Sequence, residues 1–137
     1  MNTKKMIIAV IAVFILLEAT NFLVHNVILS KTYEGLANVF RSIEEMNRLM
    51  WRMLIADLVW SFFFVFIFIK GYQNKGLLEG IRYGVYIAMF MNFVAAVAQN
   101  YAYPIPYTLA LQWFIYGSIQ SILLGVVTAL IYKPKAV

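Results

Sequence analysis

The stretch MIIAVIAVFILLEATNFLVHNVIL, at residues 6–29, decides the fold class of this chain. It is mostly apolar and slightly longer than the ~20 residues that an α-helix needs to cross about 30 Å of hydrocarbon. Three more apolar stretches of comparable length follow at residues 53–69, 78–98 and 108–132. Lipid offers no hydrogen-bond partners to bare backbone groups, so helices are the expected form. The sequence predicts an all-α integral membrane protein, a single transmembrane domain over residues 1–137 with four spanning helices.

The composition also indicates a lipid environment. The 137 residues are 64% hydrophobic and 12% charged, whereas a soluble domain is about half apolar and one-quarter charged. A globule of this size has too little interior to hide that excess, so the apolar surface must face lipid. The chain has no Cys, which excludes disulfides and thiolate metal sites. The lipid bilayer is therefore the first expected partner, and we expect no nucleic acid, no cofactor and no metal.

The basic residues, which give a net charge of +5, set the expected orientation. One side of the membrane receives Lys4, Lys5, Lys70, Lys75, Arg82, Lys133 and Lys135. The other side receives Lys31, Arg41, Arg48 and Arg52. Because Lys and Arg favour the cytoplasmic side, both termini and the 70–77 loop are predicted to be cytoplasmic. The connections are short, which predicts an up-down-up-down bundle.

The N-terminal stretch also has the three regions of a signal peptide, since Lys4 and Lys5 precede the apolar run and the polar EATN interrupts it. Cleavage after Ala19 would place Leu17 at the −3 position, where a small residue is required. Hydrophobicity also resumes directly after EATN. We therefore expect this segment to be retained as a transmembrane helix.

The longest connection, residues 30–52, contains a helix start signal. Ser42 is followed three residues later by Glu45, the spacing of a capping box, in which hydroxyl and carboxylate satisfy the first free N–H groups of a helix. The pattern predicts a helix that begins at Ile43 and continues without a break into the second span. Its extracytoplasmic part, residues 42–52, is amphipathic. Either this part lies on the membrane surface or on a partner, or the helix simply begins outside the bilayer.

Small residues recur at steps of four in the last two spans. The third span carries Gly80, Gly84 and Ala88, and the fourth carries Gly117, Ser121 and Gly125. Such ladders let two helix backbones approach closely, which matters in lipid because the hydrophobic effect does not drive helices together there. The sequence predicts that these two spans pack against each other. The alternative is that one ladder forms a contact between copies of the chain.

One polar residue in each span lies at a similar depth, counted from the cytoplasmic end at about 1.5 Å per residue. These residues are Glu18, Asp57, Asn92 and Gln120. On the first helix, Asn21 and His25 lie within about 60° of Glu18 and extend its stripe toward the extracytoplasmic side. The sequence thus predicts a polar layer inside the membrane.

A charged carboxylate at mid-bilayer costs at least ~2.5 kcal/mol, which leaves two expectations for Glu18. In the first, it is protonated and donates hydrogen bonds to Asn92 or Gln120, which would staple the bundle. In the second, it lines a hydrated cavity and binds a proton, a cation or a cationic substrate. His25 lies near the helix end, where a hydrogen bond to Asp57 or to a lipid headgroup is the expected role.

Three stretches, VHNVILSKTY at 24–33, GLLEGIRYGVYIA at 76–88 and NYAYPIPY at 100–107, resemble a group of small four-span bacterial inner-membrane proteins. The resemblance implies a bacterial inner-membrane location and no particular chemistry.

The residues favour a protein without catalysis. Glu18 and His25 are about 10 Å apart along a helix axis, too far to share a metal ion. We expect a non-catalytic accessory or assembly subunit of a larger membrane complex, with other subunits or copies of itself as partners. The first alternative is an oligomeric proton- or cation-coupled small transporter or channel that uses Glu18. The second is an enzyme or lipid-binding protein that uses Glu18, His25 and Asp57 near the outer leaflet.

Overall fold

The computed structural model describes residues 2–133, and no strand occurs in that part of the chain. Its elements are, in chain order, α1 (Thr3–Asn21), the π-helix η1 (Phe22–Ile28), α2 (Ser30–Glu34), α3 (Ile43–Lys70), α4 (Leu77–Ile87), the π-helix η2 (Ala88–Phe93), α5 (Val94–Ala102) and α6 (Tyr107–Ile131). They form four continuous helical rods, and each is long and apolar enough to cross a membrane. The predicted all-helical class with four such helices is therefore confirmed.

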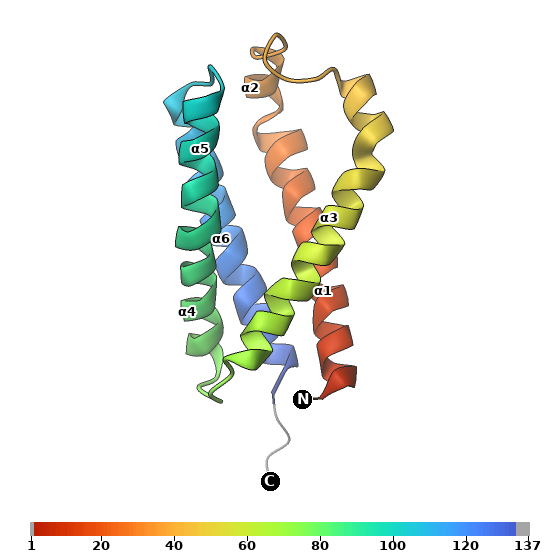
Figure 1. Cartoon of the computed structure of the whole chain (residues 1–137), viewed down its shortest axis with the longest axis vertical. Coiled ribbons are helices and arrows are strands. Elements are labelled where there is room, and N and C mark those ends of the chain that lie inside the picture. Colours follow the sequence, from red (N-terminus) through yellow and green to blue (C-terminus); the bar gives the residue numbers. More distant parts are fainter. Residues whose placement is uncertain (1, 134–137) are drawn as a thin grey trace.

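The rods alternate in direction, and both described ends of the chain lie at the same end of the bundle (Figure 1). The backbone N–H of Asn2 donates a hydrogen bond to the Tyr132 hydroxyl at 3.1 Å. The Lys5 ammonium group donates to the carbonyl of Lys133 beside it. We call this the terminal end and the opposite one the distal end.

The helix α3 begins at Ile43 and continues to Lys70 without a break, as the capping pattern predicted. The Ser42 hydroxyl accepts a hydrogen bond from the backbone N–H of Glu45 at 3.2 Å. The reciprocal half of the capping box is absent, because the Glu45 carboxylate pairs with the Arg41 guanidinium one turn away. The charged partner is the stronger donor, so it takes the carboxylate from the Ser42 backbone.

The helices α4 and α6 touch through their backbones. A methyl group added at Gly84 would lie 2.5 Å from the Ile122 Cα and 2.5 Å from the Ser121 carbonyl oxygen. Gly80 meets Gly125 in the same way one turn nearer the terminal end. Such close approach is possible only without side chains. These glycines therefore face one another inside the chain and are not available for a contact between copies.

Two further residues of the predicted ladders have different neighbours. Ala88 is buried, at the point where α4 passes into η2. A methyl group on Gly117 would meet the Asn92 amide at 3.0 Å rather than a backbone. The close seam is therefore confined to the terminal half of the α4–α6 pair.

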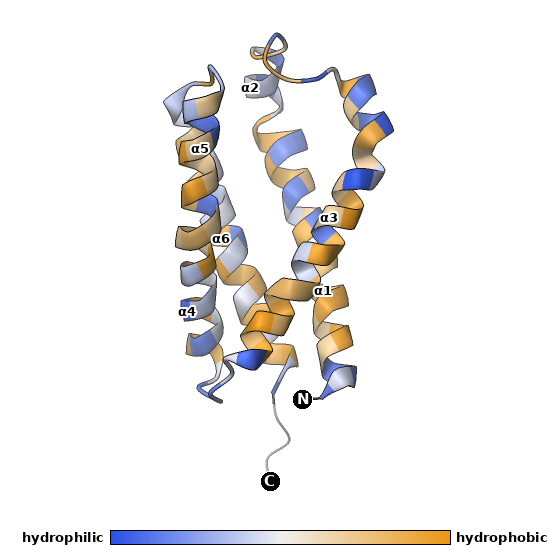
Figure 2. Cartoon of the chain, viewed as in Figure 1, coloured by the Kyte–Doolittle hydropathy of each residue, from blue (hydrophilic) through white to orange (hydrophobic). Residues whose placement is uncertain are grey.

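Hydrophobic residues predominate along the terminal halves of α1, α3 and α6 (Figure 2). The terminal core contains Val13, Leu17, Phe64, Val65 and Leu124. A smaller distal cluster forms around Leu29, Ile105 and Leu109. On the outer faces, large apolar side chains stay exposed on all four rods, as expected for helices whose solvent is lipid.

The first half of α3 diverges from the other helices toward the distal end (Figure 1). Its buried residues all lie in the second half, from Ser61 to Ile69. On the predicted amphipathic face, Met46, Met50 and Leu54 remain exposed. The helix is thus attached to the bundle by one half only.

Two rods contain π-helical turns that the sequence analysis did not anticipate. In η1 the N–H of Leu29 bonds to the carbonyl of Val24, five residues earlier, at 2.9 Å. In η2 the wider turn contains Asn92. Each π turn has one residue more than an α turn, and such turns are often found at functional sites.

Candidate functional site

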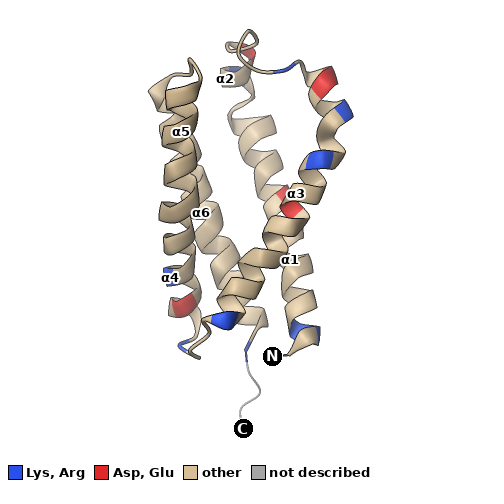
Figure 3. Ribbon diagram, viewed as in Figure 1, with Lys and Arg blue, Asp and Glu red and all other residues tan. Residues whose placement is uncertain are grey.

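Two carboxyl groups meet where α1 and α3 cross. Glu18 projects from α1 and Asp57 from α3, and the two side chains lie close to each other. Both are partly buried, and one carboxyl oxygen of Glu18 is buried without a hydrogen-bond partner. Within residues 2–133 the sole ion pair joins Arg41 to Glu45, so no basic side chain neutralises the two acids (Figure 3).

Like charges in contact repel, and in lipid the repulsion is screened far less than in water. A proton held between the two carboxyls removes one charge and supplies a hydrogen-bond donor for the other group. A monovalent cation between them would act similarly. Two carboxyl groups in this arrangement can share a proton or bind a small cation.

Ser61 lies one helical turn from Asp57 toward the terminal end. Its side chain is fully buried, and its hydroxyl has no hydrogen-bond partner in the described part of the chain. A buried polar atom without a partner costs about 1–3 kcal/mol. The interface between α1 and α3 therefore contains two unsatisfied oxygen-bearing groups within about one turn.

The side-chain amides of Asn92 and Gln120 form hydrogen bonds with residues other than Glu18. The Gln120 side chain of α6 donates to the Thr20 hydroxyl at 2.5 Å and to the Asn21 carbonyl oxygen at 2.9 Å. The Asn92 amide donates to the Ser121 hydroxyl at 2.9 Å. The prediction that Glu18 donates hydrogen bonds to Asn92 or Gln120 is therefore wrong.

Glu18 and Gln120 have different partners because α1 packs on both α3 and α6. Residues 18 and 20 differ by about 200° around a helix, so Glu18 faces α3 while Thr20 faces α6. The predicted layer thus exists as three separate polar groups on different helix pairs. Thr20 was missed by the sequence analysis, because a hydroxyl in an apolar helix usually bonds to its own backbone, as this one also does with Leu16.

His25 belongs to a fourth polar group, at the distal end. Its Nδ1 atom lies 2.6 Å from the Tyr33 hydroxyl, and the two rings stack. The Trp113 indole N–H donates to the same hydroxyl at 2.8 Å. Burial raises the pKa of Tyr33, and the hydrogen bond from Trp113 opposes that shift. The expected partner of His25, Asp57 or a headgroup, is therefore replaced by Tyr33.

Sequence analysis had no signal for Tyr33. Tyr33 lies in the short helix α2, which follows η1 directly. The turn between the two helices brings the Tyr33 hydroxyl to the ring of His25, eight residues earlier. The connection that achieves this has a Leu36–Phe40 segment packed against Leu29 and Trp113. Only the tertiary fold brings these side chains together.

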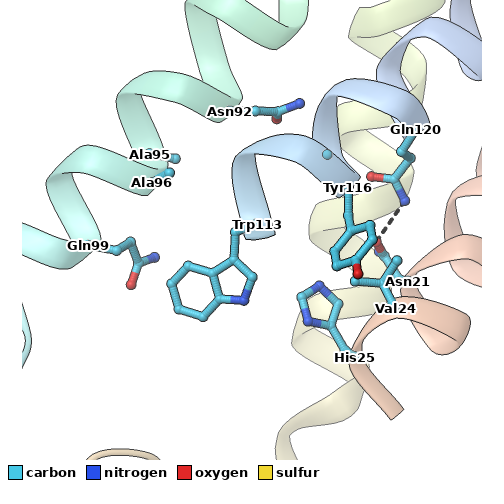
Figure 4. A pocket seen from close by; sticks show the side chains of 11 residues that line it. Asn21, Val24, His25, Asn92, Ala95, Ala96, Gln99, Trp113, Tyr116 and Gln120 are labelled. Atoms are coloured by element: carbon cyan, nitrogen blue, oxygen red, sulfur yellow. Dashed lines mark hydrogen bonds between the residues drawn. The ribbon is translucent and has the colours of Figure 1, made fainter. Parts of the chain in front are cut away.

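A partly open cavity of about 210 Å³ lies between these groups, lined by residues of α1 and η1, of η2 and α5, and of α6 (Figure 4). Asn21, Asn92, Gln120 and His25, four of the residues predicted for the layer, line it. Glu18 and Asp57 do not. The structure therefore separates the acid pair from the amide-lined cavity. Among residues 2–133, no three His, Asp or Glu side chains gather where they could hold a metal ion.

Comparison of this chain with protein-family models, with curated proteins and with solved structures finds no match. The interpretation of the site therefore rests on its geometry and chemistry.

Proposed function

We propose that the protein is a small proton- or cation-coupled transporter in which the Glu18–Asp57 pair is the coupling site. The observation that carries this proposal is the closeness of two carboxyl groups inside the apolar zone, with no ion pair to a basic side chain in the described part of the chain. A structural role alone would be met by one acid and one amide. Two acids need a proton or a cation to stay together.

The position of the pair suggests how occupancy is coupled to movement. Asp57 lies where α3 leaves the bundle, between its packed half and its exposed half. A shared proton holds α3 against α1 at this point. When the proton leaves, two charges remain, and their repulsion favours separation of the exposed half of α3 from α1. Such a two-state element is what a transporter needs to change access.

The location is part of the same proposal. Basic residues are more frequent at the terminal end, and the positive-inside rule places that end in the cytoplasm. A bacterial inner membrane would then have the distal cavity on its outer side. One copy of 137 residues offers little room for a complete pathway, so we propose that at least two copies work together.

Infrared spectroscopy tests the pair directly, because a protonated carboxyl group has its own C=O stretching band. We expect the wild-type protein in lipid vesicles to show such a band at neutral pH, and Glu18→Gln and Asp57→Asn each to lose it. Glu45→Gln, at an exposed acid, is the matched control and keeps the band. Absence of the band in wild type would contradict proton coupling at this pair, and its persistence in both site variants would show that the band comes from another group.

A flux assay tests the coupling. Vesicles with an internal pH-sensitive dye are exposed to a proton gradient, and the rate of acidification is compared among the same variants. Glu18→Gln and Asp57→Asn should reduce the protein-dependent rate to that of empty vesicles, while Glu45→Gln retains it. Equal rates for wild type and Glu18→Gln would remove the coupling role.

A second candidate is an accessory or assembly subunit of a larger membrane complex, without catalysis of its own. It is favoured by the exposed amphipathic face of α3, on which Met46, Met50 and Leu54 are large apolar side chains about half exposed. Gentle purification from native membranes should then recover larger subunits in fixed ratio, and Met50→Glu should release them. Purification as a pure homo-oligomer would favour the transporter instead.

A further inference from the structure

The cavity near the distal end has a defined position between two packed regions. Toward the terminal end, the hydrogen bonds of Gln120 with Asn21 and of Asn92 with Ser121 close it. At the other end, Trp113 lines it and packs into the distal apolar cluster. His25, Ala95 and Gln99 are exposed as well as lining the cavity, so its mouth lies between η1 and α5.

The lining has no formal charge. None of its residues is Asp, Glu, Lys or Arg, and its one titratable side chain in the neutral range is His25. An ion that entered would lose its hydration without gaining a counter-charge, which is costly. An uncharged molecule loses much less hydration free energy when it enters the cavity.

The lining nevertheless offers both hydrogen-bond donors and acceptors. The NH₂ groups of Asn92 and Gln120 are used within the protein, which leaves their carbonyl oxygens as free acceptors. The Gln99 amide has no side-chain bond within residues 2–133 and supplies both kinds of group. Trp113 and Tyr116 add flat aromatic faces (Figure 4).

His25 supplies a donor whose position is set by the protein. Because Trp113 can only donate, the Tyr33 hydroxyl accepts from it. All groups are satisfied when Tyr33 then donates its own proton to Nδ1 of a neutral His25. That arrangement fixes the tautomer and leaves the Nε2–H of His25 free to bond to an occupant.

We propose that this cavity is a binding site for a small, uncharged, flat molecule that carries both a hydrogen-bond donor and an acceptor, such as an aromatic amide. Its volume of about 210 Å³ leaves room for a small compound, and its open side gives such a compound access. The free Gln99 amide can bind such an edge with a pair of hydrogen bonds, the carbonyl oxygens of Asn92 and Gln120 can accept one bond each, and aromatic side chains stack on such rings. The site does not depend on the state of the Glu18–Asp57 pair.

Fluorescence of Trp113 provides the test. Trp51 and Trp60, the other two of the three tryptophans, are replaced by Phe in the full chain, which is held in lipid nanodiscs. Nicotinamide and nicotinate are the probes, because they share one ring and differ in charge at neutral pH. We expect saturable quenching by nicotinamide, with an apparent affinity at least about tenfold above that for nicotinate, a difference of about 1.4 kcal/mol.

Matched substitutions locate the effect. Ala95→Leu fills the mouth and should abolish saturable quenching, whereas Ala98→Leu, the same change on a residue outside the lining, should leave it intact. Gln99→Leu should weaken it about tenfold or more. Both altered lining residues are exposed, so the fold tolerates the changes.

Three results would overturn the proposal. One is equal quenching by nicotinamide and nicotinate. Another is quenching that Ala95→Leu leaves unchanged. The third is strong quenching of Trp113 by lipids with a spin-labelled acyl chain together with no response to nicotinamide, which would show that the cavity holds a lipid chain.

Discussion

Replacement of Gly84 by Ala tests whether the α4–α6 seam stabilises the bundle. A new Cβ would lie 2.5 Å from the Ile122 Cα and from the Ser121 carbonyl oxygen, whereas carbon atoms need about 3.5–4.0 Å. The two helices must therefore separate by about 1 Å. Overpacking of this kind costs about 1–3 kcal/mol, and the better helix propensity of Ala returns about 1 kcal/mol. We expect a net loss of about 0–2 kcal/mol in the free energy of unfolding.

The assay is reversible unfolding in mixed detergent micelles, followed by circular dichroism. Gly71→Ala is the matched control, because its Cβ would meet only the Ile67 and Phe68 carbonyl oxygens, at 3.8 and 3.9 Å. That variant should be as stable as wild type or slightly more stable. The reasoning is refuted if Gly84→Ala unfolds with a free energy equal to or greater than that of Gly71→Ala.

Three other changes should affect local features. Ser42→Ala removes the N-cap of α3 and should destabilise the start of that helix by about 1 kcal/mol. Amide hydrogen exchange should become faster in the first turn of α3 alone, and unchanged exchange would contradict the role of Ser42 as a cap. Tyr33→Phe removes the hydroxyl that joins an indole to a histidine and should lower the unfolding free energy by about 1–3 kcal/mol, more than Tyr103→Phe does. Burial, and then the nearby Glu79 carboxylate, raise the pKa of Tyr72 above its usual value, so the folded state holds that proton more tightly. The stability from Tyr72 is complete below about pH 10 and is lost as the pH rises through the folded-state pKa; Tyr72→Phe should reduce the fall in melting temperature at alkaline pH.

Features that depend on local composition were accessible from the sequence. Apolar stretches long enough for a bilayer predicted the four rods, and Ser42 with Glu45 predicted the start of α3 at Ile43. The step of four between Gly80 and Gly84 predicted the close contact with α6. Each of these follows from spacing along one helix.

Contacts between side chains of different helices were harder to predict from the sequence. Residue counting gives depth along a helix axis, and by that measure Glu18, Asp57 and Gln120 share one level. It does not give the rotation of each helix about its axis, which decides that Glu18 meets Asp57 and that Gln120 meets Asn21. Rotation depends on packing and on the π turns, and no residue pattern marked those turns in advance.

The π turns of η1 and η2 also bear on how this chain can change over evolution. Each π turn accommodates one extra residue, so loss of one codon within it would restore a regular α-helix and leave the residues beyond it facing nearly the same way. In the third rod, Gly80 and Gly84 would keep their contact with α6, and Gln99 would still face the cavity. Single-residue gaps at 22–28 and 88–93 in related genes would therefore preserve the bundle and alter the cavity wall, to which His25 of η1 and Asn92 of η2 contribute.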